Sequence, residues 1–90
     1  MVYGLIQYYR MLTTDGSWSQ DCLDSEIFQV EADNPNQIII DDFLPIDDTI
    51  DVEYFEVCKQ NVSNEWIVIG EFNLDEDEHR WVYIPETWGN

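Results

Sequence analysis

Basic residues are nearly absent from this 90-residue chain, which carries 3 Lys and Arg side chains against 20 Asp and Glu side chains. The formal net charge is −17, and the basic residues are Arg10, Lys59 and Arg80. Nucleic acids and anionic membranes attract Lys and Arg side chains and repel an acidic surface. The composition therefore excludes direct binding to nucleic acid or to a membrane, and it favours a basic protein as the partner.

Cysteine and long apolar runs are also scarce. Cys22 and Cys58 are the two cysteines, and without an export signal we expect free thiols in a reducing compartment. The apolar start, MVYGLIQYYRML, lacks the basic leader and the small-residue cleavage site of a signal peptide. No stretch approaches the roughly 20 apolar residues of a membrane span. These absences predict a soluble, cytoplasmic protein.

Catalytic and metal-binding motifs are missing. His79 is the single histidine and lies in the charged segment EDEHRW, where nothing in the sequence orients it as a general base. The run Asp75 to Glu78 lacks the spacing, glycine and closing Glu of an EF-hand. His79, Cys22 and Cys58 are too scattered for a zinc site. We expect no enzymatic activity, no cofactor and no dedicated metal site.

The apolar residues that are present follow a β pattern. They make up 44% of the chain, and turn signals recur about every ten residues without a long helical period. Strands are predicted over residues 2–12, 26–32, 37–40, 50–60, 65–72 and 80–84. Residues 17–24 are ambiguous, because Trp18 and Cys22 have helical i, i+4 spacing.

The pattern indicates one mainly β domain over residues 1–90: a small antiparallel sheet, barrel or sandwich, with one short helix allowed and an α+β fold as the alternative. Most aromatic residues are expected in the core, and Trp88 is the one expected to be exposed.

The most informative stretch runs from Asp41 to Glu56, DDFLPIDDTIDVEYFE, where seven carboxylates alternate with apolar residues. Within residues 50–60, simple alternation places Ile50, Val52, Tyr54 and Cys58 on one strand face and Asp51, Glu53, Phe55, Val57 and Lys59 on the other. Carboxylates two residues apart on one face lie about 6.6 Å apart and repel by about 0.6 kcal/mol at the dielectric constant of water. About a dozen such pairs would offset much of the roughly 5–15 kcal/mol that stabilises a small domain. We therefore expect the charge to have a use.

Carboxylates held on a β frame can present a row of negative charge similar to the phosphates of a duplex. A groove lined with Lys and Arg would accept such a row with fast, electrostatically steered association. The residues expected to bind a partner in this way are Asp41, Asp42, Asp47, Asp48, Asp51, Glu53, Asp75, Glu76, Asp77 and Glu78. The expected partner is a basic nucleic-acid-binding protein or effector complex.

The segments IIIDDFLPIDDTIDVEYFE and FNLDEDE, together with the small size and one-signed charge, resemble phage-encoded DNA-mimic inhibitors of bacterial defence, of the anti-CRISPR or anti-restriction kind. The resemblance is one of composition, and it implies a mode of action in the bacterial cytoplasm without catalytic residues. Two alternatives stay open. An immunity-type or adaptor protein could cap a basic partner such as a toxin nuclease, and a general adaptation to high salt also produces acidic surfaces.

Overall fold

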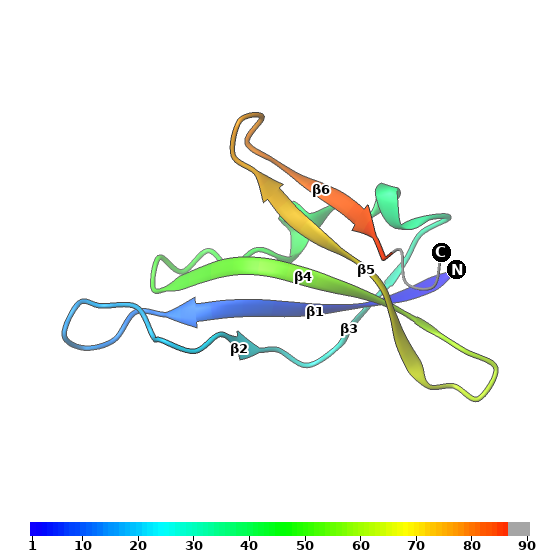
Figure 1. The fold of residues 1–90 in the computed structure, drawn as a ribbon, viewed down its shortest axis with the longest axis horizontal. Helices are drawn as coiled ribbons and strands as arrows, with labels where there is room; N and C mark the ends of the chain where they lie inside the picture. Colours follow the sequence, from blue (N-terminus) through cyan, green and yellow to red (C-terminus); the bar gives the residue numbers. More distant parts are fainter. Residues whose placement is uncertain (87–90) are drawn as a thin grey trace.

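Strand β4 (Ile50–Gln60) lies at the centre of an antiparallel sheet in the computed structural model, which describes residues 1–86 (Figure 1). It pairs with β1 (Val2–Met11) on one side and with β5 (Trp66–Asp75) on the other. Beyond β5 lies β6 (Arg80–Pro85), while β2 (Leu23–Asp24) and β3 (Phe28–Glu31) both pair with β1. The predicted fold class is confirmed: 52% of residues are in strands of one six-stranded sheet, and residues 1–86 contain no long helix.

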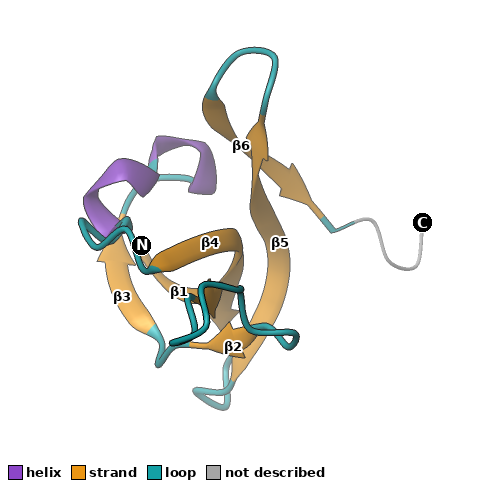
Figure 2. Cartoon of the chain, turned by 90° about the vertical axis from the view of Figure 1, so that its left-hand side faces the viewer, coloured by secondary structure: helices purple, strands orange, loops and turns teal. Residues whose placement is uncertain are grey.

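The core lies on the concave face of this sheet. The alternating residues Leu5 on β1, Phe55 and Val57 on β4, and Phe72 on β5 point to that face and are buried. Figure 2 shows the sheet curling, with two short 3₁₀ helices over its open side. We call the opposite, convex side the outer face. Because the inner face is filled by apolar side chains, the carboxylates of the paired strands are left to the outer face.

The edge of the sheet beside β1 is broken into two pieces. Tyr8 pairs with Asp24 in β2, and Leu5 pairs with Phe28 in β3. Between these pieces the hydroxyl of Ser25 accepts a hydrogen bond from the Gln7 backbone N–H at 2.9 Å. Residues 17–24, where a helical turn was one possibility, contain an isolated bridge and β2, and no helix.

The strand predicted over residues 37–40 is wrong. This segment runs from the last residue of the 3₁₀ helix η1 (Pro35–Gln37) to the first residue of the 3₁₀ helix η2 (Ile40–Phe43). The Asn34 side chain accepts a hydrogen bond from the backbone N–H of Asn36 and starts η1, with proline in its first turn. Ile38 and Ile40 are buried in the core whereas Ile39 is 63% exposed. The strand-like alternation of burial is therefore real, although the segment pairs with no strand in residues 1–86.

Two β-bulges change the register of the sheet. Tyr8 pairs with Tyr54 but Tyr9 pairs with Val52, so Glu53 has no opposite partner. The single alternation predicted across residues 50–60 is therefore wrong: Val52 packs against the same core as Phe55, which simple alternation placed on the other face. The bulge turns Glu53 out of the core-facing row in which simple alternation would have placed it.

The remaining expectations concern single residues. Cys22 is exposed and Cys58 is buried, and both are free thiols. Trp88 lies outside the described residues. No helix within residues 1–86 is both long enough and apolar enough to cross a membrane.

Candidate acidic interaction surface

The carboxylates carried by strands gather on the outer face of the sheet. Asp51 pairs with Arg10 across β4 and β1. Its side chain lies on the same face of the sheet as Tyr8 and Tyr54, and the neighbouring Val52 faces the core. By the same registers, the outer-face strand carboxylates are those of Asp24, Glu31, Asp51, Glu56, Glu71 and Asp75. The remaining strand carboxylate, that of Glu53, sits in the bulge. Six of the seven strand carboxylates therefore lie on the side of the curled sheet opposite the core.

The first predicted cluster, residues 41–53, begins in η2 and continues through the loop into β4. Asp41, Asp42, Asp47, Asp48 and Asp51 are all exposed. Asp47 Oδ1 accepts hydrogen bonds from the Thr49 N–H at 2.9 Å and from its hydroxyl at 2.7 Å. These bonds hold the pKa of Asp47 below its ordinary value. The loop thus keeps at least this carboxylate charged and fixed in direction.

Within this cluster, the Glu53 carboxylate forms an ion pair inside the protein. Arg10 Nε lies 3.0 Å from Glu53 Oε1, and Arg10 Nη1 also donates to the Ser19 and Gln20 carbonyls. A carboxylate already paired with an arginine offers less to a basic partner. We therefore expect Glu53 to contribute less than the neighbouring aspartates.

The second predicted cluster, Asp75 to Glu78, forms the turn between β5 and β6. Asp75 Oδ1 accepts hydrogen bonds from the backbone N–H groups of Asp77, at 3.0 Å, and Glu78, at 3.3 Å. Glu78 forms an ion pair with Arg80, which leaves Glu76 and Asp77 as the unpaired, exposed carboxylates at the tip of the turn.

Asp41, in the first predicted cluster, lies beside the residues that directly follow the second cluster. Asp41, together with residues 38–40, lines a pocket of about 200 Å³ whose other wall is His79, Arg80 and Trp81. Asp47, Asp48 and Asp51 lie away from this pocket, at the end of the molecule where β4 begins (Figure 1). The ten predicted residues thus lie in two separate patches, one over residues 41–53 and one at the β5–β6 turn, and they do not form a single row.

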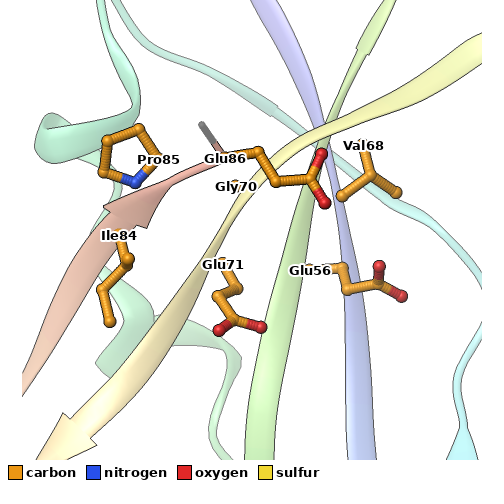
Figure 3. Close-up of a pocket in the computed structure, with 7 residues that line it drawn as sticks. All are labelled: Glu56, Val68, Gly70, Glu71, Ile84, Pro85 and Glu86. Carbon is orange, nitrogen blue, oxygen red and sulfur yellow. The ribbon is translucent and has the colours of Figure 1, made fainter. Parts of the chain in front are cut away.

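Sequence reasoning missed a third group, Glu56, Glu71 and Glu86. Glu56 on β4 lies directly opposite Glu71 on β5. With Glu86 they surround a pocket of about 340 Å³ whose apolar wall is Val68, Ile84 and Pro85 (Figure 3). The hydrophobic and acidic lining would suit the alkyl stem and charged head of a Lys or Arg side chain.

The register that creates this group depends on the second bulge. From the β4–β5 turn the pairs run in step up to Cys58 with Val68, and the next pair is Val57 with Gly70, so Ile69 is the extra residue. Without the bulge, Glu56 would face Gly70. Glycine within a strand favours a bulge, so Gly70 is a local signal for it, but the sequence alone does not give the consequence for Glu56.

Glu56 is also tied to the aromatic part of the outer face. The Tyr8 hydroxyl donates a hydrogen bond to Glu56 Oε1, and the Tyr8 ring stacks on Tyr54 with centroids 4.6 Å apart. The bond to the carboxylate, aided by desolvation, raises the pKa of Tyr8 above its ordinary value. This network fixes the direction of one carboxylate in the middle of the sheet.

The same acidic residues of the described chain do not form a metal site. Across residues 1–86, no three His, Cys, Asp or Glu side chains come together in a way that could hold a metal ion. His79 is exposed in the β5–β6 turn, where its backbone is left-handed with φ of 54°. His79 also lines the pocket that Asp41 borders.

Comparisons of the chain with models of protein families, with curated proteins and with solved structures found no match. The interpretation of the acidic surface therefore depends on its geometry and charge.

Proposed function

We propose that the chain is a non-enzymatic inhibitor that mimics nucleic acid and blocks the basic DNA- or RNA-binding groove of a nucleic-acid-binding effector. The proposed targets are effectors of bacterial defence. The anti-CRISPR and anti-restriction proteins that this chain resembles in composition act on effectors of this kind. The observation that carries the proposal is the gathering of strand carboxylates on the outer face, opposite the core.

The spacing on this face supports the comparison with a polynucleotide. Neighbouring strands lie about 4.8 Å apart and residues rise about 3.3 Å along a strand. Asp51 and Glu56 on β4 are thus separated by roughly 16 Å along the strand, and Glu71 lies one strand away from Glu56. Duplex DNA has one phosphate per about 3.4 Å of axis on each strand. The protein has fewer charges than the duplex, but they stand on a scaffold that does not have to be ordered on binding.

The small number of basic residues in the chain also supports the proposal. Arg10 and Arg80 are ion-paired with Glu53 and Glu78, and Lys59 lies at the far end of β4 beside the β4–β5 turn. Most of the negative charge is thus left for an external partner. A surface of one sign attracts a basic groove at long range, and the attraction is screened by salt.

The test is a competition assay with purified effectors of defined type. A single-protein RNA-guided nuclease, a multi-subunit RNA-guided complex and a type I restriction enzyme are each mixed with fluorescent duplex DNA, and the chain is titrated in. We expect DNA to be displaced from at least one of them. Retention of DNA by all three at a hundredfold molar excess of the chain would contradict the proposal.

Matched variants separate surface geometry from total charge. Asp51→Asn with Glu71→Gln removes two outer-face charges, whereas Asp33→Asn with Glu65→Gln removes two loop charges elsewhere and changes the net charge equally. Partly exposed ion pairs are worth up to about 1 kcal/mol each, so the first pair should weaken inhibition by about 3- to 30-fold. The second pair should stay within about twofold. Equal effects would show that net charge, and not the outer face, decides binding.

The capping alternative predicts a different result. A protein that caps an exosite of a toxin nuclease need not exclude nucleic acid, so effector, DNA and chain would form a ternary complex. A mimic and DNA exclude each other.

A further inference from the structure

The hairpin tip, residues 11–20, projects beyond the sheet at the end of β1, far from the β4–β5 turn (Figure 1). Its backbone is closed by bonds from Thr13 N–H to the Ser17 carbonyl at 2.7 Å and from Ser19 N–H to the Met11 carbonyl at 2.8 Å. Gly16, with φ of 87°, supplies the left-handed residue that the turn requires. The tip is therefore ordered by its own hydrogen bonds, although it packs on little of the core.

Two large apolar side chains lie side by side on this tip. Leu12 and Trp18 face each other in an isolated antiparallel bridge, and residues in this relation have Cβ atoms about 4.5–5.5 Å apart on the same face. Leu12 is 39% exposed and Trp18 is 43% exposed. Solvent alone does not favour an exposed Trp–Leu pair, whereas tryptophan is enriched among the residues that dominate binding energy in interfaces.

Two carboxylates with fixed directions lie in the segments that adjoin the pair. In the turn, Asp15 Oδ1 accepts hydrogen bonds from the Ser17 N–H at 3.0 Å and hydroxyl at 2.6 Å. These bonds, with one from the Thr13 hydroxyl, lower the pKa of Asp15 to about 2. On the other side, Leu12 N–H donates to the Thr49 carbonyl at 2.8 Å, which brings the loop that carries Asp47 next to the pair.

Charge decides which occupant suits this surface. An anionic membrane and a nucleic acid are repelled by the flanking carboxylates and by the net charge. A second copy of the chain would place the same carboxylates against one another. An apolar pocket bordered by Lys and Arg on another protein is complementary to both the Leu12–Trp18 pair and the carboxylates beside it.

We infer that Leu12 and Trp18 form an apolar anchor that enters a pocket bordered by Lys and Arg on the protein whose nucleic-acid groove the chain blocks. This inference rests on the proposed function and adds to it a determinant of specificity. Carboxylates alone suit any basic groove, and nucleic acid carries no counterpart of the anchor. The anchor therefore selects one basic protein among many.

The experiment uses the effector that the wild-type chain displaces from DNA. The inhibition constant is measured at several salt concentrations for the wild type, Trp18→Ala and Trp18→Phe, with Val62→Ala as the control. Val62 is fully exposed in the β4–β5 turn, far from the tip. Trp18→Ala should weaken inhibition about thirtyfold, which is about 2 kcal/mol at 1.4 kcal/mol per tenfold change. Its salt dependence should match that of the wild type, because no charge is removed. Trp18→Phe should stay within about fivefold and Val62→Ala within about twofold.

A second measurement uses the wild-type chain, so that its result does not depend on whether Trp18→Ala folds. The wild-type chain is labelled with 5-fluorotryptophan, and Trp18→Phe identifies the Trp18 resonance by its disappearance. That resonance should shift when the effector is added.

The outcomes separate the two proposals. If the wild type displaces DNA but Trp18→Ala inhibits equally well, or the Trp18 resonance does not move, the anchor is refuted and the mimic stands. If the wild type displaces DNA from none of the three effectors, the mimic is refuted and the anchor with it. A wild-type dimer that Trp18→Ala abolishes would show that the occupant is a second copy and would overturn the inference.

Discussion

Replacing Glu71 with Gln should stabilise the protein. Glu56 and Glu71 are half-buried and lie directly opposite each other on β4 and β5, where like charges are destabilising. At a separation of about 6 Å the repulsion is about 0.7 kcal/mol with the dielectric constant of water and about 2.8 kcal/mol with an effective value of 20. For a partly exposed pair we expect a gain of about 1 kcal/mol, or a melting temperature higher by about 4–8 °C.

The two partners of this pair are not equivalent, which provides an internal control. Glu56 accepts the hydrogen bond of the Tyr8 hydroxyl, and a hydrogen bond to a charged group contributes about 1.5–3 kcal/mol. Glu56→Gln removes the repulsion but also weakens this bond. We expect it to leave stability unchanged or lower, and we expect Tyr8→Phe to abolish that difference between Glu56→Gln and Glu71→Gln.

Urea unfolding of the wild type and both variants, at 50 mM and at 1 M NaCl, measures these effects. The gain from Glu71→Gln should shrink at 1 M NaCl, where the Debye length is about 3 Å. A Glu71→Gln protein that is no more stable than the wild type at low salt would refute the reasoning. A gain of equal size at both salt concentrations would also refute it, because repulsion would not be its cause.

Three further predictions follow from the same structure. The melting temperature of the wild type should rise between about 10 mM and 300 mM NaCl as self-repulsion is screened, and a calorimetric scan that shows no rise would contradict this. Gly70→Ala should cost about 1–3 kcal/mol in urea unfolding, because the new Cβ would lie 2.5 Å from Tyr83 Oη and 2.7 Å from the Ile84 carbonyl; a neutral result would mean that β6 moves freely. The folded-state pKa of Asp15 is lowered from 3.8 to about 2, so its stabilisation of the tip is complete above pH 3.8 and is lost as the pH falls through about 2. Amide exchange at Ser17 should follow that change, and it should become independent of pH in this range, once corrected for intrinsic exchange, in Asp15→Asn.

Much of the fold could be predicted because its strands carry local signals. The alternation of β-branched and aromatic residues predicted residues 50–60, which are the bounds of β4. Residues 37–40 misled for a physical reason: Ile38 and Ile40 are buried as in a strand, but composition reports burial and says nothing of a hydrogen-bonding partner. The proline of η1 and the cap from Asn34 decided the local conformation.

The site was less predictable, because bulges and cross-strand registers create it. The acidic runs were visible in the sequence, and they lie on exposed loops and strand ends as expected for a binding surface. The pairing of Glu56 with Glu71 required the extra residue Ile69; the neighbouring Gly70 favours a bulge, but it does not specify which residues are then paired. The ion pair that engages Glu53 joins residues 43 positions apart, Arg10 and Glu53, and contacts of this range are set by the whole sheet.

The central claim is that the chain and nucleic acid compete for one groove, and calorimetric titration of the effector with the chain at increasing concentrations of a short duplex tests it most directly. The apparent dissociation constant of the chain should rise in proportion to the duplex concentration, once that concentration exceeds the dissociation constant of the effector for the duplex. A dissociation constant that stays the same at saturating duplex would contradict it.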